Sequence, residues 1–475
     1  MVAIIGAGPS GIYAAEALSQ QVEVPVHVAV IDRLPVPFGL VRYGVAPDHH
    51  SIRSIRHTLE RTLDKSGVRF YGDVSIGTHL TIQELRGSVD AVIYAYGSGS
   101  DKRLDIPGED LPGSIAAPEF VAWYCGHPDV HPDTHPAPSV TSSRSARSSN
   151  RAERAAELIA VVREAVVVGV GNVALDVARV LIKTSDQLAD TDMADDVLDA
   201  LAGKVVTDVH LLGRRGPAYT SFTTKELREL GQLDGVDIIV QRDDFDLDPS
   251  SLAVIGQDKV AARNVAVMRE WAERELTGAP RRIHLHFWTK PVRLDGRVAV
   301  EAVEVEQTTI NSAGAVVGTG EYRQIPAQLV VRSVGYRGLP LPGVPYDEST
   351  GRVPHAEGRV IRDGAFSRDE YVTGWIKRGP TGVIGTNKSD AVETVASLLA
   401  DVRDGEVAPG HRTAELDELL TTRGIRALGM PAWHRIDAAE IHRGLSHGRQ
   451  RTTLAHRSEL LAAAAEDPPA ALHAP

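Results

Sequence analysis

Short apolar runs alternate with longer amphipathic stretches along the chain. Runs rich in Val, Ile and Ala begin at Val2 and at Glu164 and occupy residues 26–32, 90–97, 208–216 and 327–338, and we expect them to be strands. A helix is predicted from about Ser51 to Leu63, because Ile52, Ile55 and Leu59 recur at helical spacing. Strands that alternate with helices predict an α/β protein.

The first strand runs directly into a Gly-rich turn and a helix, "VAIIGAGPSGIYAAEAL". Gly6, Gly8 and Gly11 fit the G-x-G-x-x-G pattern, in which glycines permit a tight turn, a close approach of backbone to a pyrophosphate and close helix packing. Asp32 ends the second strand about 20 residues later, where a carboxylate holds ribose hydroxyls. This context predicts a dinucleotide site that includes Ser10 of the same turn.

A second turn of this kind occurs in "VVVGVGNVALDVARVL", with Gly169, Gly171 and Ala174 at the three positions. The next strand ends in Arg214 and Arg215 instead of an acid. Two guanidiniums favour a 2′-phosphate, so this site is predicted to take NADP(H), although a solvated basic turn would have the same sequence. About 40 residues separate Ala174 from Arg214 against a usual 20 or so, and the polar stretch 184–204 is interpreted as inserted helix.

The runs at 90–97 and 327–338 flank the second strand–turn–helix unit, and both lead into glycine. We therefore expect a discontinuous first domain that contains the second as an insertion, each a Rossmann-like three-layer α/β domain. The predicted boundaries are 1–99 and 328–475 for an FAD-binding domain and 100–327 for an NADP-binding domain. Residues 127–154 are rich in Pro, Ser and Arg without periodicity and are predicted to be a disordered loop.

Composition narrows the chemistry. The 475 residues carry a net charge of −12, which argues against a nucleic-acid partner, and no apolar run approaches the roughly 20 residues of a membrane span. With a strand beginning at Val2 and no signal segment expected, the chain is predicted to be cytoplasmic. A single cysteine, Cys125, excludes a redox dithiol or a cluster held by four thiolates of this chain. FAD is then the redox group left to accept a hydride from NADP(H).

Three longer motifs, "PVPFGLVRYGVAPDH" (35–49), "GRRGPAYTSFTTKELREL" (213–230) and "YVTGWIKRGPTGVIGTN" (371–387), closely resemble the adrenodoxin-reductase-type ferredoxin–NADP(+) reductases from residue 1 to about 400. The resemblance implies an FAD site at the first turn, Asp32, Gly39, Leu40, Trp375, Gly382, Val383 and Ile384. It implies an NADP site at Asn172, Val173, Ala174, Arg214, Arg215, Glu226 and Gly382. His49, Glu226 and Trp375 would stand near the redox centre.

The family's activity implies that hydride passes from NADPH to FAD and that single electrons leave for a separate ferredoxin-type iron–sulfur protein. Such carriers are usually acidic, so transient electrostatic docking would use a basic patch, for which Arg53, Arg56, Arg61 and residues 263–274 are candidates. Alternatives are an NADPH diaphorase or quinone reductase, the reductase subunit of a larger complex, and a nucleotide-binding scaffold without turnover. Three regions depart from the family: the Ser/Arg-rich loop 139–154, Lys102 and Arg103 near the nucleotide position, and the tail after residue 410.

The residues of the segment 371–402 independently predict a strand, a Gly-rich loop and a helix. We expect a strand that ends at Trp375, a loop with three glycines, and a helix that begins near Asn387 or Ser389, either of which can cap it. Its N-terminus would stabilise negative charge on a flavin. A plain Gly-rich connector and a core role for Trp375 are the alternatives.

Several histidines invite a metal interpretation. His127, His131 and His135 recur every fourth residue, but the prolines between them forbid the helix that would align them. His284 and His286 share one face of a strand and are interpreted as half-buried sheet residues. His49 could be a surface histidine without a proton-handling role, and Glu226 could be a solvated helix residue.

Overall fold

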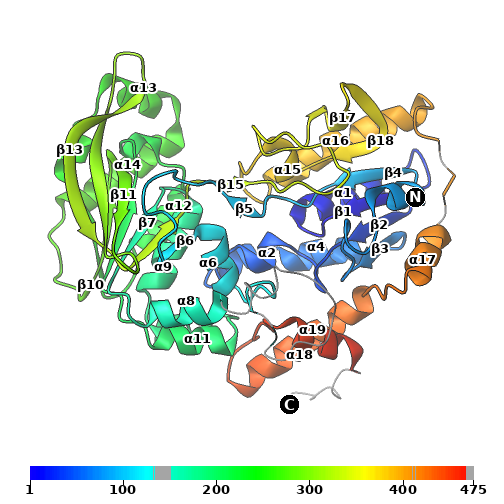
Figure 1. The fold of residues 1–475 in the computed structure, drawn as a ribbon, viewed down its shortest axis with the longest axis horizontal. Helices are drawn as coiled ribbons and strands as arrows, with labels where there is room; N and C mark the ends of the chain where they lie inside the picture. Colours follow the sequence, from blue (N-terminus) through cyan, green and yellow to red (C-terminus); the bar gives the residue numbers. More distant parts are fainter. Residues whose placement is uncertain (132, 134–150, 409, 412, 467–475) are drawn as a thin grey trace. The chain divides into compact units, whose positions relative to one another are not determined.

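The apolar runs build two separate parallel sheets. The computed structural model describes residues 1–131, 133, 151–408, 410, 411 and 413–466. The chain divides into unit 1, Met1–Ser100 with Gly335–Pro475, and unit 2, Asp101–Val334. Figure 1 labels the helices and strands of both units.

The sheet of unit 1 has seven strands in the order β16-β17-β18-β4-β1-β2-β3. Strands β18, β4, β1, β2 and β3 pair in parallel, and β16 and β17 form an antiparallel extension. The strands are β1 (Val2–Ile5), β2 (Val28–Ile31), β3 (Val68–Tyr71), β4 (Ala91–Tyr94), β16 (His355–Ala356), β17 (Arg359–Arg362) and β18 (Ala365–Val372), with short β5 (Ser100–Asp101) and β15 (Tyr336–Arg337) near the unit's ends. N-terminal and C-terminal segments thus complete one sheet, as the blue and yellow strands of Figure 1 show.

Ten helices of unit 1 surround this sheet within the described residues. Helix α1 contacts β1, β2 and α16. The helices are α1 (Pro9–Gln20), α2 (Leu40–Tyr43), α3 (His50–Arg53), α4 (Arg56–Leu63), α5 (Ile82–Arg86), α15 (Trp375–Arg378), α16 (Thr386–Arg403), α17 (Thr413–Thr422), α18 (Met430–Ser446) and α19 (Arg457–Ala465). The single helix predicted over 51–63 is therefore wrong, since the helix breaks between Arg53 and Arg56.

Unit 2 contains a six-stranded parallel sheet, β6-β14-β7-β8-β10-β9, and an antiparallel sheet, β11-β12-β13. The strands are β6 (Ser114–Ala116), β7 (Glu164–Val168), β8 (Asp208–Leu212), β9 (Val236–Val240), β10 (Arg281–His286), β11 (Thr289–Asp295), β12 (Ala302–Ile310), β13 (Val316–Pro326) and β14 (Leu329–Arg332). The predicted boundary after residue 327 would place strand β14 in the FAD-binding domain. It pairs with β6 and β7 instead, so residues 328–334 belong to unit 2.

The helices of unit 2 include the inserted polar stretch, where α10 and α11 lie as predicted. They are α6 (Ala117–Tyr124), α8 (Arg151–Ile159), α9 (Asn172–Ile182), α10 (Ser185–Leu188), α11 (Asp195–Ala202), α12 (Thr224–Leu230), α13 (Pro249–Gln257) and α14 (Lys259–Glu273), with 3-10 turns η1 (Pro217–Tyr219) and η2 (Arg242–Phe245). The predicted loop 127–154 lies mostly outside the described residues. Its last part, from Arg151, is helical because "RAERAAEL" consists of strong helix formers.

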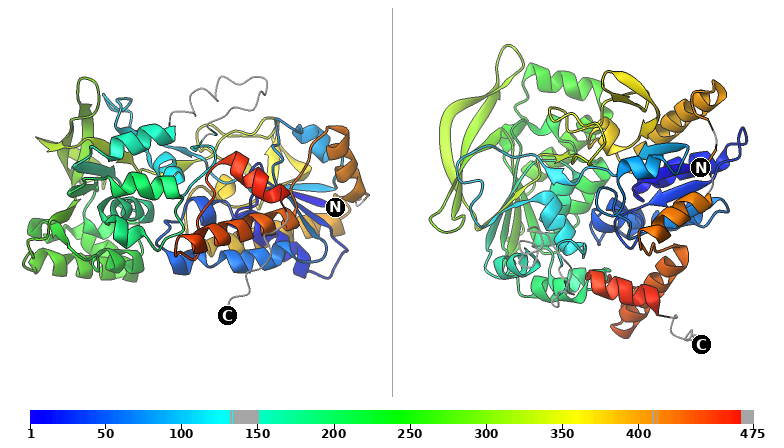
Figure 2. Two further views of the ribbon diagram at one scale, coloured as in Figure 1. Left: turned by 90° about the horizontal axis from the view of Figure 1, so that it is seen from below. Right: turned by 45° about the vertical axis from the view of Figure 1, so that its right-hand side comes forward.

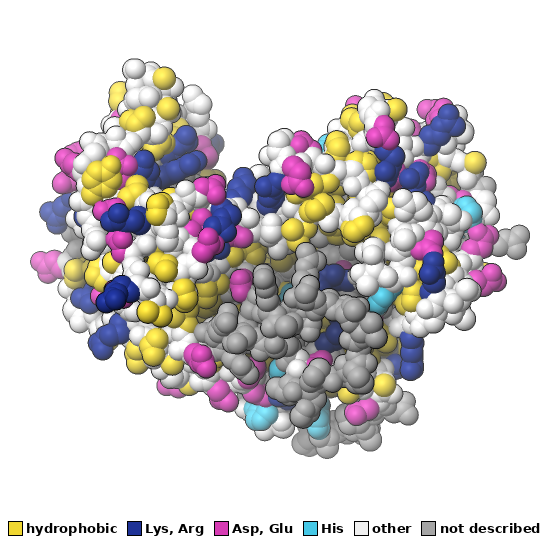
Figure 3. All heavy atoms as spheres, viewed as in Figure 1, with side chains coloured by type: hydrophobic (Ala, Val, Ile, Leu, Met, Phe, Trp, Pro, Cys, Tyr) yellow, Lys and Arg dark blue, Asp and Glu magenta, His cyan; other side chains and the backbone are white. Residues whose placement is uncertain are grey.

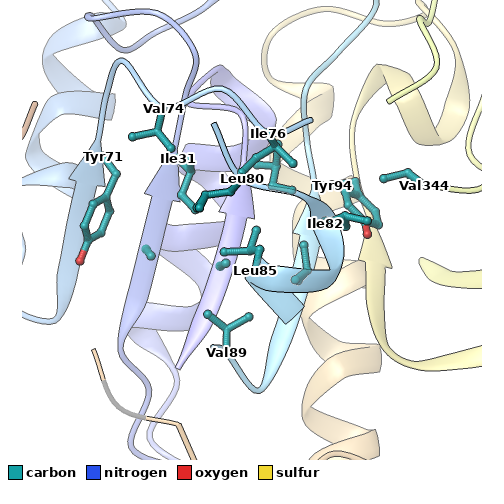
Figure 4. Packing of buried hydrophobic residues seen from close by; sticks show 14 of the residues in the cluster. Ile31, Tyr71, Val74, Ile76, Leu80, Ile82, Leu85, Val89, Tyr94 and Val344 are labelled. Atoms are coloured by element: carbon teal, nitrogen blue, oxygen red, sulfur yellow. The ribbon is translucent and has the colours of Figure 1, made fainter. Parts of the chain in front are cut away.

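Each unit has a core of its own. In unit 1, side chains from β1–β4 and α5 meet residues that follow the insertion, including Val344, Val360 and Val372. Figure 4 shows Leu80, Ile82 and Leu85 packed over the strands that carry Ile31 and Tyr94. In unit 2 the cluster joins β7 and β14 to the antiparallel sheet. The C-terminal part is therefore integral to the hydrophobic core of unit 1.

Candidate active site

The first Gly-rich turn needs its glycines for steric reasons. Gly6 has φ +112°, and a Cβ there would lie 2.5 Å from the carbonyl oxygen of Ala95. A Cβ on Gly11 would lie 1.9 Å from the carbonyl oxygen of Gly6. Gly8 precedes α1 and offers no side-chain cap, so the first N–H groups of α1 are open to an external acceptor. This geometry accommodates a pyrophosphate at the helix N-terminus.

Asp32 follows β2 and braces this turn. Its carboxylate accepts hydrogen bonds from the backbone N–H groups of Ala7, at 2.7 Å, and Leu34, at 2.9 Å. A carboxylate at this strand end is the group that holds ribose hydroxyls in dinucleotide sites, which is the role predicted for Asp32. One side chain thus fixes two loops that border the candidate dinucleotide site.

The loop at Phe38–Leu40 lies against the same turn. The N–H of Phe38 donates to the carbonyl of Ala7 at 2.7 Å, and Phe38 has φ +85°. Gly39 has φ +47°, and a Cβ there would lie 2.9 Å from the Cα of Gly8. The approach requires glycine at position 39, whereas a Cβ on Gly8 would lie 3.9 Å from the Cα of Gly39, an ordinary contact, so the loop at Gly39–Leu40 borders the turn.

The segment after β18 differs from the prediction in two places. The strand ends at Val372, not Trp375, because Gly374 turns the chain with φ +79° and Trp375 begins α15. Helix α16 begins at Thr386 after Gly385, so neither Asn387 nor Ser389 is the N-cap. The side-chain oxygen Oδ1 of Asn387 instead accepts hydrogen bonds from the Ser10 hydroxyl and from the Arg378 guanidinium, each at 2.8 Å.

These contacts tie the late segment to the first turn. A Cβ on Gly374 would lie 2.2 Å from the hydroxyl oxygen of Ser10, so the chain passes directly beside α1. The Trp375 ring lies 5.4 Å from that of Tyr336, and Val383 is exposed. Gly382, at φ +82°, lies next to Thr386. The predicted residue Ser10 therefore lies beside Gly374 and Asn387, and Gly382, Val383 and Ile384 form the loop that precedes α16.

The sequence analysis missed the charges beneath this loop. Asp390 pairs with Lys377 at 2.8 Å and with Arg378 at 2.9 Å, and its carboxylate is nearly inaccessible. The hydroxyl of Thr373 also donates to Asp390 at 3.2 Å. Lys377 and Arg378 lie 13 and 12 positions before Asp390 and on a different helix, so no local spacing in the sequence links these charges. This network fixes α15 against α16.

The second Gly-rich turn shows the same steric demands in unit 2. A Cβ on Gly169, at φ +136°, would lie 2.3 Å from the carbonyl oxygen of Ser333. Gly171 caps α9 without a side chain, and Ala174 is fully buried in that helix. The Asn172 side chain accepts from the N–H of Thr223 at 2.9 Å, which joins the turn to the segment 213–230.

Arg214 and Arg215 follow β8 and are both exposed. The Arg215 guanidinium lies over the Tyr219 ring at 5.1 Å, and the Thr308 hydroxyl holds the Arg214 carbonyl at 2.9 Å. Among the described residues no carboxylate forms an ion pair with either side chain. Arg103, by contrast, pairs with Asp110 at 2.9 Å. Two unneutralised guanidiniums at a strand end suit a phosphate.

Glu226 lies in the first turn of α12, where the Thr223 hydroxyl caps the helix. Its carboxylate is 3.7 Å from the Arg179 guanidinium of α9. His49 is the residue that precedes α3 in unit 1. These two predicted residues belong to different units, and each keeps its family assignment as a prediction.

Three described histidines of unit 2 lie close together, but their ring geometry does not favour a metal ion. The rings of His210, His284 and His286 stack with centroids 4.4–5.9 Å apart and interplanar angles of at most 19°. Their nitrogens lie within 4.8 Å of one another, but lone pairs in parallel ring planes do not converge on one ion. His131 contacts Asp196 and the Trp123 carbonyl, and His135 lies outside the described residues.

One predicted docking residue is misplaced. Arg53 is buried and donates to the carbonyl of Val45 at 2.9 Å, so it cannot contribute to a surface patch. Arg61 and Arg263 remain exposed. Over the part of the face in Figure 3 that is described, Lys and Arg side chains are interspersed with Asp and Glu.

Comparison with known proteins gives consistent relatives. Residues 1–261 match the model of the pyridine nucleotide-disulphide oxidoreductase family. The chain is 42% identical to the NADPH-ferredoxin reductase FprA of Mycobacterium tuberculosis, over 97% of this chain and 98% of the relative. It is 36% identical to the mitochondrial NADPH:adrenodoxin oxidoreductase of Arabidopsis thaliana, over 98% and 95% of the two chains.

A solved structure of Mycobacterium tuberculosis FprA in complex with NADPH has the same fold, with a TM-score of 0.87 and 41% identity. The similarity covers 98% of this chain and 99% of that one. The predicted α/β architecture is thereby confirmed. None of the helices in the described part of the chain combines the length and apolar character that crossing a bilayer requires.

Proposed function

The chain belongs to the pyridine nucleotide-disulphide oxidoreductases, within the ferredoxin–NADP reductases of adrenodoxin-reductase type, and on that basis we propose that it is an FAD-dependent NADPH:ferredoxin oxidoreductase. The name of the broad family mentions a disulphide, but this chain has only Cys125, which is buried. Electrons therefore leave through a separate acceptor and not through a dithiol of this chain.

The contrast between the two Gly-rich turns carries the proposal. The strand after the first turn leads to Asp32, an acceptor for ribose hydroxyls, whereas the strand after the second leads to Arg214 and Arg215. A carboxylate would repel a 2′-phosphate and two guanidiniums attract it. The first site thus suits FAD and the second suits NADP(H).

The residues of the first site fit FAD on three grounds. The uncapped N-terminus of α1 offers N–H groups to a pyrophosphate. The approach of Gly39 to Gly8 leaves no side chain between loop and turn. Asp32 presents its carboxylate where β2 ends, beside the turn, the position from which a carboxylate holds ribose hydroxyls. When bound, FAD supplies two-electron acceptance from NADPH and one-electron release.

We assign the protein's own contributions as follows. Gly6, Gly8, Ser10, Gly11 and the loops at Gly39–Leu40 and Gly382–Ile384 hold FAD. The second turn, with Asn172, Val173, Arg214 and Arg215, holds NADP(H). For His49, Glu226 and Trp375 we propose the roles near the redox centre that the family resemblance implies. The fixed position of Glu226 beside Arg179 supports its role as an orienting group.

The partner is a ferredoxin-type iron–sulfur protein, as the names of the relatives indicate for their own reactions. We propose transient electrostatic docking through exposed arginines such as Arg61 and Arg263. Since exposed charges are screened within about 8–10 Å at physiological salt, the Michaelis constant for an acidic ferredoxin should rise with ionic strength.

The test is an anaerobic titration of the purified protein with NADPH and, separately, NADH, followed by flavin absorbance. Bleaching by NADPH at much lower concentration than by NADH supports the two-site assignment. Faster reoxidation by a ferredoxin than by a quinone then separates a ferredoxin reductase from a diaphorase. A colourless protein, or a flavin that neither nucleotide reduces, would refute the proposal.

A further inference from the structure

The tail after residue 410, which the sequence analysis could not assign, reaches the candidate flavin loop through a buried ionic network. Glu440 of α18 is completely buried and is held by two guanidiniums. Its carboxylate accepts two bonds from Arg42, one of them at 3.0 Å, and one from Arg451 at 2.6 Å. The N–H of Leu454 donates a further bond at 2.9 Å. Arg42 and Arg451 are themselves buried, so the carboxylate of Glu440 is shielded from water on both sides.

The two arginines stabilise the ionised form of Glu440. Burial by itself would raise the pKa of Glu440, but the charges of Arg42 and Arg451 overcome it and hold the pKa at about 2. Arg451 also pairs with Asp437, which lies one turn before Glu440 on α18. Gly444 allows this return of the chain, because a Cβ there would lie 2.4 Å from the backbone of Arg451. The segment 437–454 is thus folded around Glu440.

An aromatic contact supports the ionic one. The rings of Phe38 and Trp433 meet edge to face, with centroids 5.2 Å apart and an interplanar angle of 84°. The Arg42 guanidinium lies 5.7 Å from the Trp433 ring, and the indole N–H of Trp433 donates to Glu60 at 2.8 Å. Helix α18 therefore contacts both α4 and the loop before α2, and Figure 2 shows it running beside α4.

The loop that is held in this way has an uncommon backbone. Phe38 has φ +85° although it carries a bulky side chain, and Gly39 has φ +47° and ψ −124°. Such conformations persist only where the surroundings impose them. Phe38 and Arg42 lie on either side of Gly39 and Leu40, and both contact α18. The position of Gly39 against Gly8 consequently depends on the tail.

We infer that Glu440, acting through Arg42, is a positioning residue that fixes the Gly39–Leu40 loop against the Gly8 turn and so retains FAD. This rests on the proposed function, since it presumes that FAD occupies the turn. The tail then supports the flavin site indirectly, through its contacts with Phe38 and Arg42 on either side of Gly39 and Leu40.

The test compares the holoprotein with the variant Glu440→Gln, which keeps the side-chain volume and removes the charge. FAD release is followed by the recovery of free-flavin fluorescence, and the environment of bound flavin by visible circular dichroism. We expect at least a tenfold faster release and an altered visible spectrum. Glu459→Gln is the matched control, because it removes an ion pair between α18 and α19 (3.0 Å to Arg443) without touching the loop. It should release FAD within twofold of wild type.

A Glu440→Gln variant that melts at lower temperature but releases FAD at the wild-type rate with an unchanged spectrum would overturn the inference and leave the proposed function intact. If this variant does not fold, Arg42→Lys decides by the same two measurements, since lysine keeps the charge but cannot form the paired bonds. Wild-type release from Arg42→Lys would likewise overturn it. A wild-type protein that binds no flavin would overturn the proposed function as well.

Discussion

Replacing both Arg214 and Arg215 with alanine should weaken NADPH binding selectively. Both side chains are exposed and have no carboxylate partner among the described residues, so neither needs to break an ion pair before it binds a phosphate. The Tyr219 ring restrains Arg215, and Thr308 fixes the backbone at Arg214. The double variant removes the attraction for the 2′-phosphate and leaves the turn at Gly169–Ala174 unchanged.

The magnitude follows from the exposure of the pair. A hydrogen bond to a charged group contributes about 1.5–3 kcal/mol, and the lower end applies to solvated guanidiniums. Two such contacts amount to about 3 kcal/mol, which corresponds to a roughly 150-fold increase in the dissociation constant of NADP(H). NADH has no 2′-phosphate, so its dissociation constant should change by less than threefold.

The assay is a spectroscopic titration of the flavin with NADP+, supported by steady-state Michaelis constants for NADPH and NADH. Lys259→Ala combined with Arg297→Ala is the control, because it removes two exposed positive charges from unit 2 without altering the strand end after β8. Equal weakening of NADPH and NADH by the Arg214/Arg215 variant, or equal effects of test and control, would refute the 2′-phosphate assignment.

Three further predictions concern stability and chemistry. Burial first, and the neighbouring charge of His284 second, lower the pKa of His210 from 6.5 to about 4. This histidine therefore binds a proton less readily in the folded protein than in the unfolded chain. The contribution of neutral His210 to the free energy of unfolding is therefore complete above pH 6.5 and falls by about 2 kcal/mol at pH 5. Urea unfolding of His210→Phe should depend less steeply on pH than that of the wild type, and an unchanged slope would contradict this. Gly39→Ala should lose FAD during gel filtration. The control Gly364→Ala, at φ +82° with open space around it, should cost only about 1 kcal/mol of backbone strain and retain the flavin. Equal retention by the two variants would show that the Gly39–Leu40 loop is not close to FAD. Cys125→Ala should retain at least half of the NADPH-dependent ferredoxin reduction, and its inactivation would point to a thiol in the reaction.

The sequence predicted those features that depend on neighbouring residues. Val2 and Glu164 begin strands as expected, and both Gly-rich turns precede helices, because each turn is encoded within a few residues. The family was likewise identifiable, since its long motifs are contiguous. Local patterns therefore sufficed for the architecture and for the two candidate nucleotide sites.

Features that depend on distant partners were not predictable. Asparagine is a common N-cap residue, but the side-chain oxygen of Asn387 accepts hydrogen bonds from Ser10 and Arg378 instead. Arg53 has the appearance of a surface charge, but the Val45 carbonyl holds it inside. Glu440 lies in an ordinary amphipathic helix, and its partner Arg42 is 398 positions away along the chain. No spacing rule connects such residues before the fold is known.

The insertion of unit 2 has a consequence for biosynthesis. Strand β4 ends at Tyr94, but β18, which pairs with it, begins only at Ala365. At 5–20 residues per second the ribosome needs on the order of 10–50 s to make the roughly 270 residues between them. During this time unit 2 can complete its own sheet, whereas the N-terminal half-sheet keeps β4 as an unpaired, apolar edge. Nascent chains are therefore most prone to aggregation through the first hundred residues, and chaperone dependence should centre on this half-sheet.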